Sequence, residues 1–147
     1  VPAGGIDKTT ELATIDLLPT FLELAGASYP ENYQADGVSI VSAIRGEFFS
    51  RQKPIFWDWR FSSDRTDFWP SAAVQEGNWK LLTNNKLGRT ELYNIASDLA
   101  EQKDVSTENP EKLKELLGKL ETFQESLPKS APENSFSKAR TSLEPNE

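Results

Sequence analysis

A run of short strand patterns separated by tight turns, in the middle of the chain, constrains the fold most strongly. Residues 72–75 and 79–83 are rich in apolar residues, and the turn between them contains Gly77, a pattern typical of a β-hairpin. A second turn signal at residues 84–88 precedes a third strand pattern at residues 90–95. Because strands joined by such short connections pair antiparallel, these residues predict an antiparallel sheet.

One further strand pattern and a long helix pattern flank this run. Residues 53–61 alternate in character around Trp57 and Trp59, as in a strand with two different faces. The longest helix pattern begins at Pro110 and ends before Pro128. Its apolar side chains recur at helical spacing, at Leu113, Leu116, Leu117, Leu120 and Phe123. We expect this apolar stripe to pack on the sheet.

Two short helix patterns precede the strands. The first covers residues 16–25, with Thr14 or Asp16 as its cap and Gly26 after its end, and the second covers residues 38–45. Apolar residues surround most of the first helix, at Ile15, Leu17, Leu18, Phe21, Leu22, Leu24 and Ala25. Such a helix must be covered on several sides. The complete pattern predicts an α+β fold, in which two short helices precede a small antiparallel sheet of about four strands that packs against a C-terminal helix.

The chain contains no histidine and no cysteine, which restricts the chemistry it can perform. It therefore lacks the commonest general base and a thiolate nucleophile. The nearest acidic cluster, Asp98 with Glu101 and Asp104, does not have the spacing of a calcium-binding loop and is more typical of a solvated loop. We predict no catalytic residue and no metal ligand in this chain.

The charge of the chain excludes two classes of partner. Its net charge is −7, which repels nucleic acid and anionic membrane surfaces. No apolar run approaches the roughly 20 residues that span a bilayer. The chain contains no methionine and begins with Val1-Pro2, so we expect it to be a piece of a longer protein.

Clustered aromatic residues leave two interpretations open. Trp57, Trp59 and Trp69 fall close together in the sequence and could stack on sugar rings. They could equally fill the core of the sheet or lie under a missing domain, and packing is the commoner role. Arg60 could bind an anionic group in a bidentate manner or pair with an acidic side chain. If any residues of this chain contact a substrate, we expect Trp59, Arg60 and Trp69.

Five motifs, in order and at similar spacing, resemble type I sulfatases of the alkaline-phosphatase-like superfamily over roughly residues 1–127. They are the segment TIDLLPTFLELAG at residues 14–26, DGVS at 36–39, IFWD at 55–58, AVQEGNWKL at 73–81 and ELYNI at 91–95. Gln75 stands where the family usually has Arg, and Leu99 where it has Pro. The resemblance therefore concerns the fold more than any individual substrate contact.

The resemblance implies a parent protein that hydrolyses sulfate esters, of a carbohydrate or an aryl alcohol. In that family a formylglycine, made from Cys or Ser in a C/S-x-P/A-x-R motif, attacks sulfur beside a bound calcium ion. This chain contains no such motif, so the resemblance assigns formylglycine and calcium to the parent's N-terminal domain. The chain itself is expected to be a non-catalytic, inactive C-terminal portion that completes the fold and helps wall the substrate cleft.

The same resemblance divides the chain and suggests its partners. Residues 1–37 correspond to the end of the large sulfatase domain, residues 38–127 to the C-terminal subdomain and residues 128–147 to a polar tail. The expected partners are the N-terminal sulfatase domain, a sulfated glycan and, through exposed apolar surface, a second copy of the chain. The resemblance also favours a periplasmic or secreted location. The alternatives are an independent carbohydrate-binding module or a structural, assembly-forming module.

Overall fold

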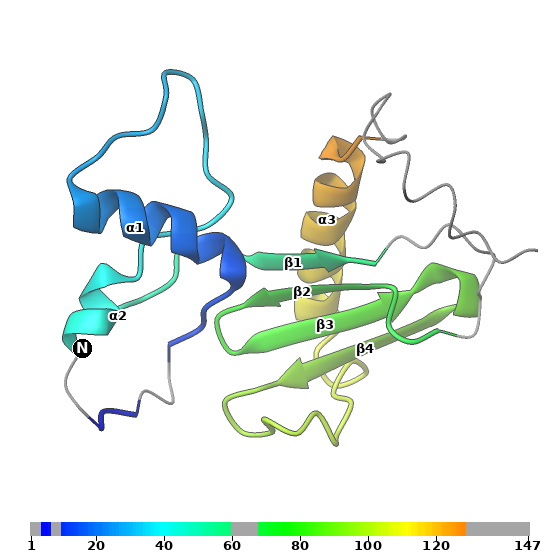
Figure 1. Cartoon of the computed structure of the whole chain (residues 1–147). Coiled ribbons are helices and arrows are strands. Elements are labelled where there is room, and N and C mark those ends of the chain that lie inside the picture. The colour runs from blue at the N-terminus through cyan, green and yellow to red at the C-terminus, as the bar shows by residue number, and fades with distance from the viewer. Residues whose placement is uncertain (1–3, 7–9, 60–67, 129–147) are drawn as a thin grey trace, which may run out of the picture.

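The computed structural model describes residues 4–6, 10–59 and 68–128 and divides into a helical part and a sheet part (Figure 1). The helical part contains the 3-10 helix η1 (Thr14–Asp16) and the α-helices α1 (Leu17–Ala25) and α2 (Val41–Arg45). The sheet part contains β1 (Ile55–Asp58), β2 (Ala72–Glu76), β3 (Trp79–Asn84), the 3-10 helix η2 (Asn85–Leu87), β4 (Arg89–Asn94) and α3 (Pro110–Ser126). The predicted α+β fold is confirmed.

The four strands form one antiparallel sheet in the order β1-β2-β3-β4. The predicted hairpin is confirmed, with Glu76 opposite Trp79 across the turn. Gly77 adopts a φ of +54° in this turn, a conformation that costs glycine little because it lacks a Cβ atom. Short turns in succession therefore produce a meander in which every strand pairs with its sequence neighbour.

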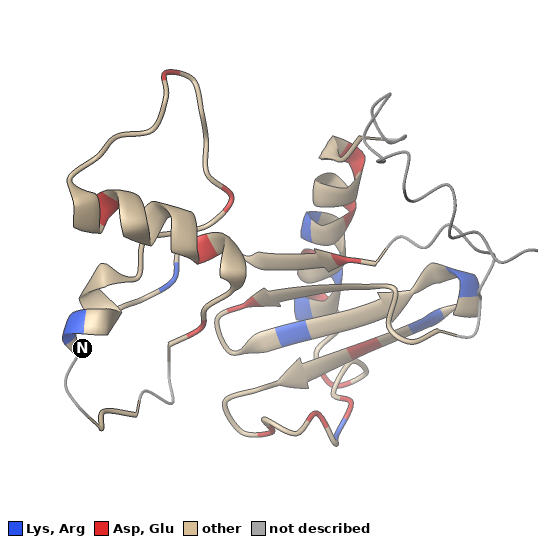
Figure 2. Cartoon of the chain, viewed as in Figure 1, with Lys and Arg blue, Asp and Glu red and all other residues tan. Residues whose placement is uncertain are grey.

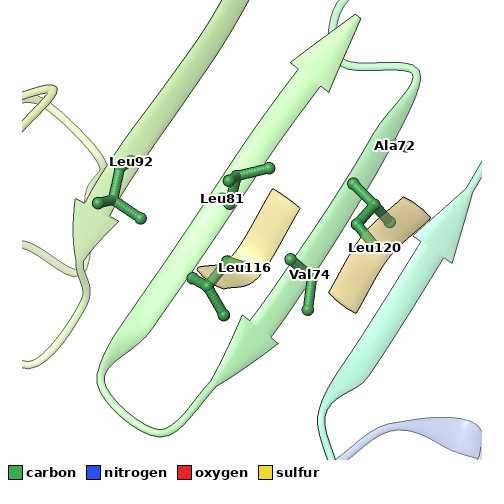
Figure 3. Close-up of a cluster of buried hydrophobic side chains, with 6 residues drawn as sticks. All are labelled: Ala72, Val74, Leu81, Leu92, Leu116 and Leu120. Atoms are coloured by element: carbon green, nitrogen blue, oxygen red, sulfur yellow. The ribbon is translucent and has the colours of Figure 1, made fainter. Parts of the chain in front are cut away.

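Helix α3 covers one face of the sheet and forms the main hydrophobic core. Leu116 and Leu120 are 0% and 2% exposed, and they pack against the inward-facing residues of the strands. Figure 3 shows these side chains together with Ala72, Val74, Leu81 and Leu92. Phe56 of β1 stacks on Phe123, with ring centroids 4.4 Å apart. The apolar side chains predicted to form a stripe over residues 110–127 are thus the ones that face the sheet.

The helical part follows the sequence prediction with one correction. Helix α1 ends at Gly26, whose φ of +63° is the predicted left-handed cap. The second helix begins at Val41 and not at residue 38. The backbone N–H groups of Val38 and Ile40 donate to the side chains of Asp16 and Thr20, which holds this segment out of the helix. A tertiary contact has overridden the local apolar pattern.

Of the remaining predicted boundaries, the structure changes one and does not test the others. The predicted strand at residues 53–61 is shorter in the structure, since β1 ends at Asp58. Residues 60–67 and the tail at residues 129–147 lie outside the described residues, so the tail prediction is untested. The division of the chain at residue 37 also remains a prediction. In the structure α2 contacts α1, and these two helices lie together, away from α3 (Figure 1).

Candidate functional site

The face of the sheet opposite α3 carries the predicted aromatic cluster. Its buried residues are Ala73, Leu82 and Tyr93, one from each of β2, β3 and β4. Trp57, Trp69 and Ile95 pack against them and are partly buried. We call this surface the aromatic face. It is a second hydrophobic layer, in which Trp57 and Trp69 take part in packing.

Two of the three predicted substrate-contacting residues lie at one end of this sheet. Trp59 directly follows β1, is 40% exposed, and donates its backbone N–H to the carbonyl oxygen of Ser71 at 2.9 Å. Trp69 lies two residues before Ser71 and packs on the aromatic face. Arg60 lies outside the described residues. The structure thus brings Trp59 and Trp69 to the same end of the sheet and exposes them unequally.

A row of polar side chains along β4 holds Trp69. The guanidinium carbon of Arg89 lies 4.1 Å from the centroid of the Trp69 ring. Arg89 donates to Oε1 of Glu91 from Nε at 2.8 Å and from Nη2 at 2.5 Å. The hydroxyl group of Tyr93 donates to Oε2 of the same carboxylate at 2.6 Å. The row Trp69–Arg89–Glu91–Tyr93 is therefore continuous, and we call it the Trp69 row.

Burial and the carboxylate of Glu91 raise the pKa of Tyr93. The phenol consequently stays protonated and remains a hydrogen-bond donor at neutral pH. Sequence analysis did not identify Arg89, Glu91 and Tyr93 as a group. Their spacing of two residues within a strand pattern is the signal that could have found them, because it puts all three on one face.

Asn84 fixes the segment that precedes Trp69. Its side-chain amide donates to the carbonyl oxygen of Phe68 at 2.6 Å, and its amide oxygen accepts from the backbone N–H of Leu87 at 3.2 Å. The side chain is almost fully buried. The backbone N–H of Ser71 also donates to the carbonyl oxygen of Thr83 at 3.0 Å. Residues 68–71 are therefore attached to β3 at both ends.

The other cation of the aromatic face is also paired. Nζ of Lys80 lies 2.5 Å from Oε1 of Glu101 and 5.8 Å from the centroid of the Trp57 ring. Both side chains of the ion pair are about a quarter exposed. Trp57 and Trp69 thus each have a paired cation over one ring face, which leaves Trp59 as the more accessible tryptophan at this end.

The acidic cluster of the sequence is a hydrogen-bonded loop. Asp98 accepts from the backbone N–H groups of Gln102 and Lys103, both at 2.8 Å. Asp104 accepts from the N–H groups of Leu92 at 3.0 Å and Ser106 at 2.9 Å. Burial opposes ionisation of Asp104, but these bonds lower its pKa. In residues 4–6, 10–59 and 68–128, no three His, Cys, Asp or Glu side chains gather as a metal site.

A buried polar cluster organises the helical part. Asp16 has no exposed surface and accepts from Nη1 of Arg51 at 2.7 Å. Its carboxylate also accepts from the backbone N–H groups of Ala13 at 2.7 Å and Val38 at 2.9 Å. Burial alone would raise the pKa of Asp16, but the Arg51 bond and the two backbone bonds hold it below its usual value. This Asp16 cluster joins two of the five motifs, because Val38 belongs to the second.

Glu11 connects the helical part to the sheet. Its carboxyl group lies near the side chain of Gln75 in β2 and near the charge of Arg51. Burial raises the pKa of Glu11, although both neighbours favour its charged form. A segment that precedes α1 in the chain is thus in contact with the middle of the sheet.

An apolar surface of α1 remains exposed. Leu17, Leu18, Phe21 and Leu24 are between 46% and 60% exposed, and we call them the α1 face. Figure 2 shows that α1 carries little charge, and Glu23 is its one charged residue. The four apolar side chains of the α1 face form one stripe along the helix, in the spacing i, i+1, i+4 and i+7. Among the helices of the described residues, none is long and apolar enough to cross a membrane.

Comparison with known proteins places these features in a family, although no family model matches the chain. A sulfatase of Formosa agariphila is 30% identical over 119 residues, which are 75% of this chain and 21% of that protein. The crystal structure of Ps i-CgsB in complex with k-i-k-neocarrahexaose superposes with a TM-score of 0.59 and 32% identity, over 74% of this chain and 23% of that one.

A third similarity is to BT1596, a 2-O GAG sulfatase, with 25% identity and a TM-score of 0.57 over 74% of this chain and 23% of that one. The chain thus spans about a fifth of the length of the relatives that it matches. In each case the matched region is the C-terminal part of the relative. The chain belongs to the sulfatase family and corresponds to the C-terminal part of its members.

Proposed function

We propose that this chain is the non-catalytic C-terminal portion of a sulfatase, which completes the fold of a larger catalytic domain and helps wall its substrate cleft. The exposed α1 face carries the proposal. The substrate class that we propose is a sulfated carbohydrate, because two of the similar structures are described with a carrageenan oligosaccharide and as a glycosaminoglycan sulfatase.

The residue inventory supports a non-catalytic role. With no histidine and no cysteine in the sequence, the chain has neither an imidazole base nor a thiol that could become formylglycine. No C/S-x-P/A-x-R motif occurs in it. The proposal therefore assigns the nucleophile and the calcium site to the N-terminal portion. It also places the parent protein in the periplasm or outside the cell.

The α1 face supports a role in completing a larger domain. Its four side chains are on average about half exposed, at 46, 48, 60 and 56%. Full burial of one such side chain contributes about 1.5–3 kcal/mol, so covering the face would contribute about 3–6 kcal/mol. That amount is comparable to the total stability of a small domain. A covering surface of matching apolar character is what the N-terminal portion would supply.

The end of the sheet supports a role in walling the cleft. Trp59 presents an exposed ring directly after β1, and Trp69 is held beside it. Trp59, Arg60 and Trp69 are the residues that we propose to face the non-sulfated part of the substrate. An aromatic wall suits a sugar ring, because it excludes water and strengthens the electrostatic interactions of a sulfate site.

A binding experiment tests the first part of the proposal. The N-terminal portion is expressed separately, and its affinity for this chain is measured by calorimetry. We expect Phe21→Ser to weaken binding at least tenfold, since it places a hydroxyl group in the α1 face. Leu99→Ser, at a loop residue that is 85% exposed, is the matched control and should bind as the wild type does. Equal affinities for all three chains would refute the proposal.

An independent carbohydrate-binding module is the second candidate, favoured by the exposed ring of Trp59 alone. That function predicts that the isolated chain binds sulfated or plain oligosaccharides and that Trp59→Ala abolishes binding. Flat isotherms of the isolated chain across a glycan panel would exclude it. The sulfatase proposal expects such flat isotherms, because most of the cleft would belong to the N-terminal portion.

A further inference from the structure

We infer that Arg89 is a positioning residue, which acts through Trp69 to set the placement of Trp59 at the end of the sheet. The substrate-related part of this inference rests on the proposed function. It refines the aromatic wall proposed above: Trp59 contacts the carbohydrate, and Trp69 contributes to the wall as the anchor that positions Trp59.

The first step is the state of the Trp69 ring. One ring face is covered by the guanidinium group of Arg89 at 4.1 Å, and the ring packs on the aromatic face. A guanidinium at this distance is attracted by the π-electrons of the ring. Trp69 therefore has little ring surface left for a sugar. Trp59 is 40% exposed, and among the described residues no aromatic ring stacks on it and no cation lies over it.

The second step is the orientation of Arg89 itself. The side chain of Glu91 accepts both of its donated hydrogen bonds and is 14% exposed. Glu91 is fixed in turn by the hydroxyl group of Tyr93. Although the Arg89 side chain is 53% exposed, its two bonds to Oε1 of Glu91 restrain the guanidinium group where its central carbon lies over the indole ring.

The third step is the connection from Trp69 to Trp59. Trp69 is followed by Pro70 and Ser71, and the carbonyl oxygen of Ser71 accepts the backbone N–H of Trp59 at 2.9 Å. Asn84 holds the other side of this segment through Phe68. A displacement of Trp69 is therefore passed through two residues of backbone to the strand-end bond between Ser71 and Trp59.

The test uses the indole N–H signals of the four tryptophans in a nitrogen-15 correlation spectrum. We expect Arg89→Gln to shift the signals of Trp69 and Trp59, and Arg89→Lys to shift them as well, since it keeps the charge but not the flat guanidinium. The signal of Trp79 should stay in place, because Trp79 packs on the opposite face with α3. The matched control is Lys86→Gln, which makes the same charge change at an exposed residue of η2.

Two results would overturn the positioning role. One is an unchanged Trp59 signal in Arg89→Gln, and the other is a general change in which Trp79 moves as much as Trp69. The second result would mean that Arg89 only stabilises the fold. Both readouts concern this chain alone, so they remain decisive if the sulfatase proposal itself fails.

The substrate-related part is tested in the complete sulfatase. We expect Arg89→Gln to raise KM for a sulfated carrageenan hexasaccharide about two- to fivefold, the loss that corresponds to one cation–π contact. The kcat for a small aryl sulfate should not change, because that substrate does not reach Trp59. An unchanged KM for the hexasaccharide would overturn the inference, whereas a complete absence of sulfatase turnover in the wild type would refute the proposed function instead.

Discussion

Replacing Arg51 by alanine should strongly destabilise the helical part. The two side chains of the Arg51–Asp16 pair are 3% and 1% exposed, and Nη1 lies 2.7 Å from Oδ2. In Arg51→Ala the carboxylate of Asp16 keeps its backbone bonds to Ala13 and Val38 but loses its ion pair with Arg51. Breaking a buried pair in this way costs about 3–5 kcal/mol.

Urea unfolding at pH 7, followed by circular dichroism, measures this loss. With an m-value of about 2 kcal/mol per molar urea, typical of a small protein, the midpoint should fall by about 1.5–2.5 M. Arg45→Ala, at an exposed residue of the same part, is the matched control and should shift the midpoint little. A loss below 1 kcal/mol for Arg51→Ala would refute the reasoning that the pair is buried and needed.

The same pair predicts a pH dependence with a definite sign. The folded state lowers the pKa of Asp16 below its usual value of 3.8, so the unfolded chain binds its proton more readily. The stability that the carboxylate contributes is therefore fully present above pH 3.8 and is lost as the pH falls through the folded pKa. The difference between the wild type and Arg51→Ala should accordingly shrink in this acidic range. A constant difference down to pH 2 would contradict the assignment.

Four further substitutions have clear expectations, each measured as a free energy of unfolding unless stated otherwise. Gly37→Ala should cost about 1–3 kcal/mol, because a Cβ atom there would overlap the backbone carbonyl group of Ile15. Gly118→Ala should instead stabilise α3 by up to about 1 kcal/mol, because a Cβ atom there meets no other atom. Equal changes in the free energy of unfolding for the two variants would contradict this account. Leu120→Ala should cost about 2–5 kcal/mol, since that side chain is 2% exposed in the main core, and a loss below 1 kcal/mol would argue against its burial. Phe21→Ser should leave the stability of the isolated chain within about 0.5 kcal/mol and reduce any self-association seen by sedimentation velocity; a large loss of stability would mean that the α1 face is covered within the chain.

The sheet and α3 could be predicted from the sequence because their signals are local. Gly77 marks the hairpin turn, Pro110 marks the start of α3, and the leucine spacing of α3 fixes which side faces the sheet. Each of these signals depends on residues that are close in the sequence. Apart from the shorter β1, the structure therefore follows the prediction in this part of the chain.

The helical part and the tryptophans required information from distant residues. Asp16 has the sequence position of a helix cap, yet its carboxylate accepts from Arg51, 35 residues further on. Its bond to Val38 also delays the start of α2. One face of the Trp69 ring is covered by Arg89 of β4, which is distant in the sequence. No local pattern contains these pairings.

Reconstitution of activity tests the central claim most directly. The purified chain, the N-terminal portion and an equimolar mixture of the two are assayed with a chromogenic aryl sulfate in the presence of calcium. The account predicts no turnover by this chain alone and a higher, stable turnover by the mixture than by the N-terminal portion alone. Turnover by the purified chain by itself, or a mixture no more active or stable than the N-terminal portion, would contradict the account.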